Sequence, residues 1–165
     1  MNLVFVQYLL FLWNLREAKR FKTMAIVTQG YDFVIPKRKS TAKLLAFRQR
    51  LVNKRSNSGQ WLWGPLEKKG LTDREKRNAL YAMLQEYNEL LISIVKSGLF
   101  DPIFHIDSRG LAKRDDWFDE IHLNSDSFKD VARLYYLCMH EFFKGKTSGV
   151  YSAEDDLKRA QRLWR

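Results

Sequence analysis

The chain has 165 residues, of which 45% are hydrophobic and 14% aromatic, so an intrinsically disordered chain is excluded and one domain with a sizeable core is expected. The formal net charge of +10 is unevenly placed, because residues 37–77 hold thirteen lysines and arginines against three acidic residues. Such a basic segment is typical of a solvated insertion or of a surface for an anionic partner. A single cysteine, Cys138, excludes an internal disulfide, and its apolar surroundings predict a buried thiol in a reducing compartment.

The first predicted element is a helix over residues 3–20, whose first half is apolar on nearly all sides. Positive charge follows the apolar run of residues 3–13, which is the reverse of a secretory signal. That run is also shorter than the roughly 20 residues that span a bilayer, so we expect no transmembrane segment. A buried or amphipathic helix of a cytoplasmic protein is the favoured interpretation. Weak association of residues 3–13 with a membrane surface is the alternative.

A short β-branched run over residues 24–29 ends at Gly30 and predicts a strand that is buried on both faces. Residues 37–60 are basic and polar, and we expect them to form an insertion or a loop. The aromatic segment 61–66, with two tryptophans beside Gly-Pro, predicts local packing that fixes a turn.

The clearest element is a long helix over residues 73–97. Thr72 and Glu75 have the spacing of a capping box at its start, and Gly98 ends it. Apolar residues recur every three or four positions, which predicts one buried face. That face is formed by Leu80, Met83, Leu84, Tyr87, Leu90, Leu91, Ile94 and Val95.

Residues 102–106 predict a second short strand, and residues 111–124 a loop. Ser125 is expected to be the N-cap of the next helix, residues 144–149 a linker, and Ser152 the start of a charged C-terminal helix. The apolar residues of the helix after Ser125 are Phe128, Val131, Ala132, Leu134, Tyr135 and Cys138.

The order strand, long helix, strand predicts a right-handed βαβ unit, and therefore an α/β fold with parallel strands. Ligand sites in such sheets form beyond the carboxyl ends of the strands. Three chemically interesting segments would lie at that edge of the sheet: residues 30–32, Asp107, and the loop that carries Asp119 and His122.

Asp119 and His122 form the most informative pair in the chain. A carboxylate three residues from a histidine in a loop can hold one ring nitrogen, which leaves the other to act as a general base. A nucleophile to accompany the pair is missing, because Ser108 is better explained as a turn residue and Ser125 as a helix cap. His105 is expected in the core and His140 at a helix end, and no metal-site spacing is present.

Taken in series, these segments resemble the SGNH/GDSL-type hydrolases. Asp119-Glu-Ile-His122 fits the Asp-x-x-His of that family's last motif, with Leu123 where many members have proline. The resemblance covers roughly residues 10–142. Its other features are Gly30-Tyr31-Asp32 after a strand, the Trp-Leu-x-Gly-Pro segment at 61–65, Asp107-x-Arg109-Gly110, Asp116-Trp117 and Asn124.

The resemblance implies a flavodoxin-like α/β/α fold and hydrolysis of a small-molecule ester, with His122 as general base and acid and Asp119 as its orienter. It implies no cofactor and no metal. The family's Gly-Asp-Ser nucleophile block and its Asn-Asp oxyanion block do not occur in the chain. The chain therefore resembles the C-terminal half of such an enzyme. On this interpretation residues 1–148 form a hydrolase-like domain that lacks its N-terminal part, and residues 149–165 form a helical tail.

Two other interpretations are open. The chain could be a non-catalytic binding protein that uses residues 37–77 on an anionic partner, with Trp61 and Trp63 beside Lys68 and Lys69 as a stacking platform. No recognised nucleic-acid-binding motif is present, so nucleic acid is not the expected partner. The chain could also be a remnant held at a membrane through residues 3–13. No oligomeric state is predicted.

Overall fold

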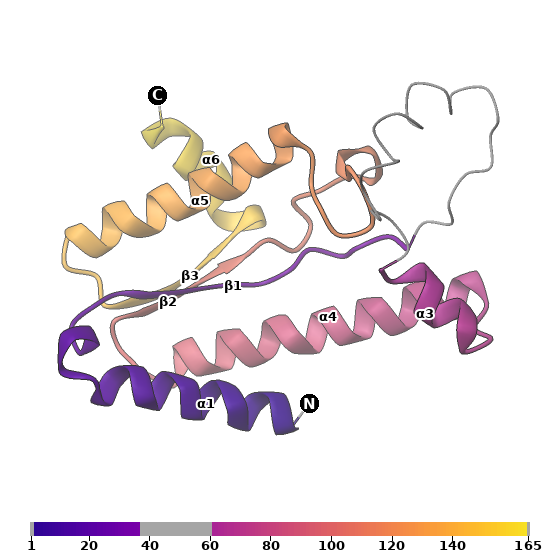
Figure 1. Cartoon of the computed structure of the whole chain (residues 1–165). Helices are drawn as coiled ribbons and strands as arrows, with labels where there is room; N and C mark the ends of the chain where they lie inside the picture. The colour runs from indigo at the N-terminus through magenta and orange to yellow at the C-terminus, as the bar shows by residue number, and fades with distance from the viewer. Residues whose placement is uncertain (1, 37–60, 165) are drawn as a thin grey trace.

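The computed structural model describes residues 2–36 and 61–164, and in them a sheet lies between two layers of helices (Figure 1). The elements in chain order are α1 (Asn2–Glu17), the 3-10 turn η1 (Lys19–Phe21), β1 (Ile26–Gln29), α3 (Trp63–Lys68), α4 (Asp73–Lys96), β2 (Ile103–Asp107), the 3-10 turn η2 (Arg114–Asp116), α5 (Ser125–Phe143), β3 (Ser148–Ser152) and α6 (Ala153–Leu163).

The sheet has the order β1-β2-β3, and both pairs of neighbouring strands are parallel. Ile26 is opposite Ile103, and Ile103 is opposite Ser148. The prediction that residues 24–29 and 102–106 form adjacent parallel strands is confirmed. The long helix α4 connects them and packs against β2 and β3, as a βαβ crossover requires.

The third strand was not predicted. Residues 144–149, which we expected to be a linker, contain the beginning of β3, which pairs with β2 along its whole length. Its sequence, Ser-Gly-Val-Tyr-Ser, holds only two good strand formers, so its hydropathy does not stand out. β3 also crosses the expected boundary between residues 1–148 and 149–165. Ala160 of α6 is fully buried in the core cluster that contains Leu134 and Leu137 of α5.

Alternate side chains of β2 enter the two halves of the core. Phe104 and Ile106 pack with Leu134 and Leu137 of α5. Ile103 packs on the opposite face, in a cluster with Leu12 of α1 and with Ile94, Val95 and Phe100. All five residues of β2 are buried, including the polar His105 and Asp107, as expected for a central strand that is covered on both faces.

α4 has the predicted capping box, in which the Thr72 hydroxyl accepts from the Glu75 backbone N–H and the Glu75 carboxylate accepts from Thr72. Gly98 follows the helix with a positive φ of 68°, the left-handed conformation that glycine adopts most readily. The prediction that Met83 belongs to the buried apolar face is wrong, because Met83 is 50% exposed. A polar residue, Asn88, is fully buried on the face that packs on the sheet.

Arg16 holds the end of α1 against the sheet. Its guanidinium donates hydrogen bonds to the carbonyl oxygens of Phe21, Met24, Phe100 and Pro102 at 2.7–3.0 Å. α1 is therefore fixed to the loops that precede β1 and β2. In the described residues, no helix combines the length and the apolar character needed to cross a membrane.

Candidate active site

The three predicted segments do lie at the carboxyl edge of the sheet. Residues 30–32 leave β1, Ser108 follows β2, and the loop between η2 and α5 lies beyond the ends of the strands (Figure 1). The Tyr31 hydroxyl donates a hydrogen bond to the carbonyl oxygen of Ile121, so the exit from β1 touches the loop directly. We call residues 117–123 the dyad loop, because it carries Asp119 and His122.

The Asp119 carboxylate orients the His122 ring. His122 Nδ1 lies 2.8 Å from Asp119 Oδ2, which confirms the predicted hydrogen bond. Asp119 Oδ1 accepts from the backbone N–H groups of Ile121 at 2.8 Å and His122 at 2.7 Å. The Asp119 side chain is 11% exposed and the His122 side chain 56% exposed, so the carboxylate is sheltered while the imidazole reaches the surface.

The charge state of Asp119 follows from these contacts. Partial burial raises the pKa of the carboxyl group, but the hydrogen bonds from the His122 ring and from two backbone N–H groups outweigh it and hold the pKa below its usual range. An ionised Asp119 favours the tautomer of His122 with the proton on Nδ1. The other nitrogen, Nε2, then carries a lone pair that can accept a proton.

The dyad loop is closed at its neck by backbone contacts. The Phe118 N–H donates to the His122 carbonyl at 2.8 Å, and Trp117 and Leu123 form an antiparallel bridge. Trp117 is buried in a small cluster with Leu80 and Leu84 of α4. The spacing of Asp119 and His122 is thus enforced by a tight turn whose base is anchored in the core.

Glu120 anchors the same turn from inside, a role that no local sequence pattern indicates. Its side chain is 1% exposed, and its two carboxylate oxygens accept from the backbone N–H groups of Leu62 at 3.0 Å and Trp63 at 2.9 Å, where α3 begins. On the other side of the turn Tyr31 binds Ile121. Burial, and next the charge of Asp119, raise the pKa of Tyr31, so its hydroxyl remains a donor.

We expect Glu120→Gln to destabilise the fold by about 1–3 kcal/mol, because the amide nitrogen would face a backbone N–H that has lost its acceptor. Glu86→Gln makes the same chemical change on an exposed position of α4 and should alter the free energy of unfolding by less than about 0.5 kcal/mol. Urea denaturation of both variants measures the difference. Equal stability of the two variants would show that Glu120 does not anchor the dyad loop.

The N-cap of α5 is Asn124, one residue earlier than predicted. Its side chain accepts from the N–H groups of Asp126 at 3.1 Å and Ser127 at 2.9 Å, so Ser125 is the first helical residue and not the cap. Asparagine is among the best capping residues, which explains the shift. Asn124 therefore ends the dyad loop and starts α5.

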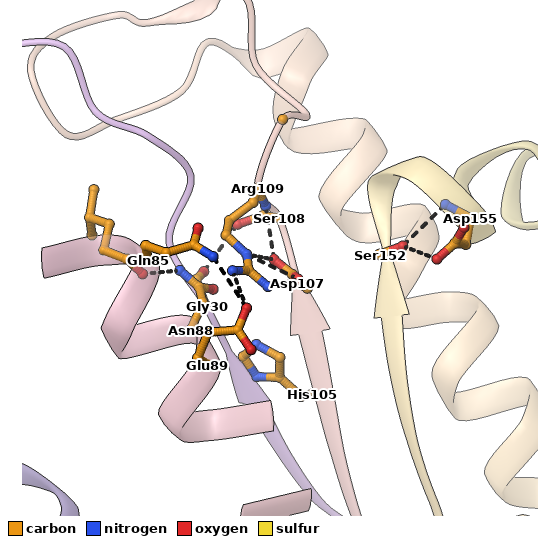
Figure 2. Close-up of polar contacts among 12 residues, drawn as sticks. Gly30, Gln85, Asn88, Glu89, His105, Asp107, Ser108, Arg109, Ser152 and Asp155 are labelled. Carbon is orange, nitrogen blue, oxygen red and sulfur yellow. Dashed lines mark hydrogen bonds and ion pairs between the residues drawn. The ribbon is translucent and has the colours of Figure 1, made fainter. Parts of the chain in front are cut away.

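Neither serine considered from the sequence is placed as a nucleophile. Ser108 is 2% exposed, and its hydroxyl donates to the Gly30 carbonyl at 3.1 Å (Figure 2). Ser125 begins α5 with its side chain exposed. In the described part of the chain, no serine or threonine hydroxyl is hydrogen-bonded to His122, whose ring binds Asp119 alone.

The remaining polar residues at the sheet edge hold the scaffold together. Asp32 is buried and accepts backbone hydrogen bonds from Gly110 at 2.8 Å and Ala112 at 2.6 Å, which ties the exit of β1 to the loop after β2. Arg109 bridges Asp107 and Glu89 of α4 (Figure 2).

Gly30 is required by close packing. A Cβ atom there would lie 1.6 Å from Oδ1 of the buried Asn88, whose amide nitrogen binds the Tyr31 carbonyl at 2.9 Å. The Gly-Tyr-Asp segment at 30–32 therefore has a structural explanation at every position, and that explanation positions the dyad loop.

His105 is a core residue, as predicted, but only one of its two ring nitrogens has a hydrogen-bond partner in the described residues. Nδ1 lies 2.9 Å from the Thr28 hydroxyl, while Nε2 is buried without a partner in the described residues. Burial lowers the pKa of His105 to about 4. His140 is in the last turn of α5, outside the dyad loop.

His105 makes stability depend on pH in a defined direction. Its folded pKa of about 4 lies below the unfolded value near 6.5, so the unfolded chain binds more protons between these values. The stability that the protein owes to neutral His105 is fully present above about pH 6.5. It is lost as the pH falls towards 4, the folded pKa of His105. Between pH 7 and 4.5 we expect the wild type to lose about 2–3 kcal/mol more than His105→Gln, as measured by urea denaturation. Parallel pH profiles for the two proteins would contradict this.

The aromatic segment beside the basic residues does not form an open platform. Trp63 is buried, and Lys76 lies over its ring with Nζ 3.7 Å from the centroid. Lys76 is itself 1% exposed and forms ion pairs with Glu67 and Asp73. Trp61 alone of the two tryptophans is exposed, and residues 37–60 of the basic segment lie outside the described part.

Across residues 2–36 and 61–164, no three histidine, cysteine, aspartate or glutamate side chains converge in a group that could hold a metal ion. Comparisons with protein-family models, with curated proteins and with solved structures found no match. The structure defines an α/β protein whose described residues contain a three-stranded parallel sheet.

Proposed function

We propose that this chain supplies the acid–histidine half of a serine-type ester hydrolase of the SGNH/GDSL kind. The observation that carries the proposal is the Asp119–His122 pair, held at 2.8 Å in an anchored turn at the carboxyl edge of a parallel sheet. A three-layer arrangement with helices on both faces of that sheet is compatible with part of a flavodoxin-like fold. A cytoplasmic location fits this reading.

In this mechanism His122 Nε2 accepts the proton of a serine hydroxyl while the serine oxygen bonds to the ester carbonyl carbon. The same proton then goes to the leaving alkoxide as the ester C–O bond breaks and an acyl-serine forms. His122 next takes a proton from water as the water oxygen bonds to the acyl carbon. It returns that proton to the serine oxygen as the bond between the acyl carbon and the serine oxygen breaks and the carboxylic acid leaves. Asp119 stays ionised throughout, keeps Nδ1 protonated and stabilises the imidazolium.

The described residues supply the base and its orienter, but not the nucleophile. A serine and the N–H donors for the oxyanion must therefore come from a segment outside the described part of the chain, and the sequence of the 165 residues contains neither Gly-Asp-Ser nor Asn-Asp. The substrate proposed is a small-molecule ester, and the chemistry requires no cofactor.

The test is a fusion. The N-terminal half of a Gly-Asp-Ser esterase, ending before its own acid–histidine block, is joined by a Gly/Ser linker to Met1 of the full chain. The linker supplies a high effective concentration, so weak docking does not mask activity. We expect hydrolysis of p-nitrophenyl acetate by the fusion and none by either half alone. A folded fusion that remains inactive would overturn the proposed function.

A further inference from the structure

We propose that a basic pocket between α5 and α6 binds a phosphate monoester whose organic part is aromatic or apolar. α5 begins beside the dyad loop and ends where the chain turns into β3, and α6 runs back from the end of β3 (Figure 1). The pocket is lined by residues near the C-terminal ends of both helices. It is separate from the dyad loop, so its ligand is independent of the proposed hydrolysis.

Three basic side chains line the pocket, which has a volume of about 350 Å³. Lys144 is the C-cap of α5, and Arg159 and Arg162 belong to the second half of α6. The two arginines are three positions apart, so they lie on one face of the helix. Pockets for small molecules typically measure roughly 300–1,000 Å³, so the space suits a small ligand.

Glu141 also lines the pocket, but its charge is already balanced. Its carboxylate accepts hydrogen bonds from the Tyr151 hydroxyl and from Lys146 Nζ, each at 2.8 Å, and it forms an ion pair with Arg159. The Arg159 guanidinium also lies 3.5 Å from the Asp156 carboxylate. Two carboxylates therefore offset two cations in this part of the pocket.

Lys144 and Arg162 keep their charges uncompensated. Within residues 2–36 and 61–164, neither side chain forms an ion pair with a carboxylate. Basic residues at a helix C-terminus commonly offset the partial charge there, which is roughly −0.5 for each helix. Two helix ends account for about −1 in this way, against +2 from the two side chains. The pocket therefore keeps about one surplus positive charge, which favours an anion.

A phosphate monoester fits these donors better than a carboxylate does. The Arg162 guanidinium offers a planar fork of N–H donors that matches two phosphate oxygens, and the Lys144 ammonium adds a point charge. A monoester carries a charge of about −1.5 to −2 at pH 7, so it can use both cations at once. A carboxylate carries only one negative charge and has no third oxygen for the lysine.

Apolar side chains adjoin the basic ones and indicate the organic part of the ligand. Leu163 lines the pocket and is 39% exposed. The next residue, Trp164, packs edge-on against Tyr136 of α5, with the ring centroids 5.2 Å apart. Both rings remain partly open to solvent, Trp164 at 50% and Tyr136 at 42%. An aromatic or apolar group attached to the phosphate would cover part of this exposed surface.

The test is titration calorimetry of the full chain with phenyl phosphate at constant ionic strength. Arg162→Ala and Lys144→Ala each remove one cation from the pocket. Arg74→Ala removes the same charge from an exposed position of α4, on the opposite face of the sheet. We expect Arg74→Ala to bind within twofold of the wild type and both pocket variants to bind at least tenfold more weakly. Arg162→Lys keeps the charge without the fork and should fall between them.

A second titration tests the apolar contact. Inorganic phosphate should bind the wild type more weakly than phenyl phosphate does, and Trp164→Ala should remove most of that difference. Equal affinity of the wild type for both compounds would overturn the assignment of an aromatic or apolar substituent. Circular dichroism checks that every variant is folded.

Two results would overturn the phosphate site itself. One is an absence of binding to phenyl phosphate at concentrations up to about 1 mM. The other is an equal loss of affinity in Arg162→Ala and Arg74→Ala, which would mean attraction to the net charge of the chain and not to the pocket.

Vesicles distinguish the two sources of such a monoester. Phosphatidic acid carries its phosphate as a monoester, and it is tested in phosphatidylcholine vesicles against phosphatidylcholine alone. Sedimentation of the wild type but not of Arg162→Ala with the phosphatidic acid vesicles would support the site with a lipid headgroup as its ligand. Binding of phenyl phosphate without sedimentation would support the site with a soluble ligand.

Discussion

The purified chain on its own is expected to hydrolyse short acyl esters no faster than the uncatalysed background. His122 is correctly oriented by Asp119, but among the described residues no hydroxyl is placed for it to activate. The sequence also contains no Asn-Asp dipeptide, the block from which the proposed mechanism would draw an oxyanion donor, and one such donor is typically worth about 10²–10³ in rate. The result should hold from neutral to mildly alkaline pH, where an ordinary histidine is deprotonated. Initial rates on p-nitrophenyl acetate measure it.

A matched variant decides what any residual rate means. Turnover that disappears in His122→Ala would contradict the expectation and would point to Ser108 or Ser125 as the nucleophile. Turnover that persists in His122→Ala would instead be assigned to a contaminating esterase. The hydroxyl of Ser108 is buried and hydrogen-bonded, and Ser125 is the first residue of a helix. Both observations argue against either serine as the nucleophile.

In the fusion with a Gly-Asp-Ser half, His122→Ala is expected to lower kcat by about 10⁴–10⁶, because the serine loses its base and the leaving group loses its acid. Asp119→Asn should cost about 10⁴, since an amide can hold the ring in the wrong tautomer and cannot stabilise an imidazolium. KM should change little in both variants, because neither side chain is assigned to substrate binding.

His140→Ala is the matched control for that loss. It removes a histidine of α5 that lies outside the dyad loop, and kcat should stay within about twofold of the parent fusion. A drop in kcat of similar size for His140→Ala and His122→Ala would mean that the substitutions act through the fold. A retained kcat in Asp119→Asn would remove Asp119 from the mechanism.

The parts of the fold that were predicted are those with strong local signals. The capping box of α4 lies within four residues, and the Asp-x-x-His spacing of the dyad loop within another four. The two apolar runs that became β1 and β2 needed only one assumption, the right-handed crossover, to be paired correctly.

The parts that were missed depend on contacts between distant segments. Glu120 reaches Leu62 across 58 positions and Tyr31 reaches Ile121 across 90, and no local pattern encodes either bond. The burial of Asn88 was not predicted, because a single polar residue hardly changes the periodicity of apolar residues along a helix. β3 was hidden because its polar ends and its glycine resemble a linker, although β2 supplies the hydrogen bonds that make it a strand.

The most direct test of the central claim is the ¹⁵N NMR spectrum of the His122 ring in the full chain near pH 8, where an ordinary imidazole is neutral. We expect the tautomer with the proton on Nδ1, held by Asp119, and an unprotonated Nε2 that can accept a proton from a nucleophile. We also expect Asp119→Asn to mix the two tautomers. A wild-type spectrum with the proton on Nε2, or one unaffected by Asp119→Asn, would contradict the claim that this pair is built as a general base.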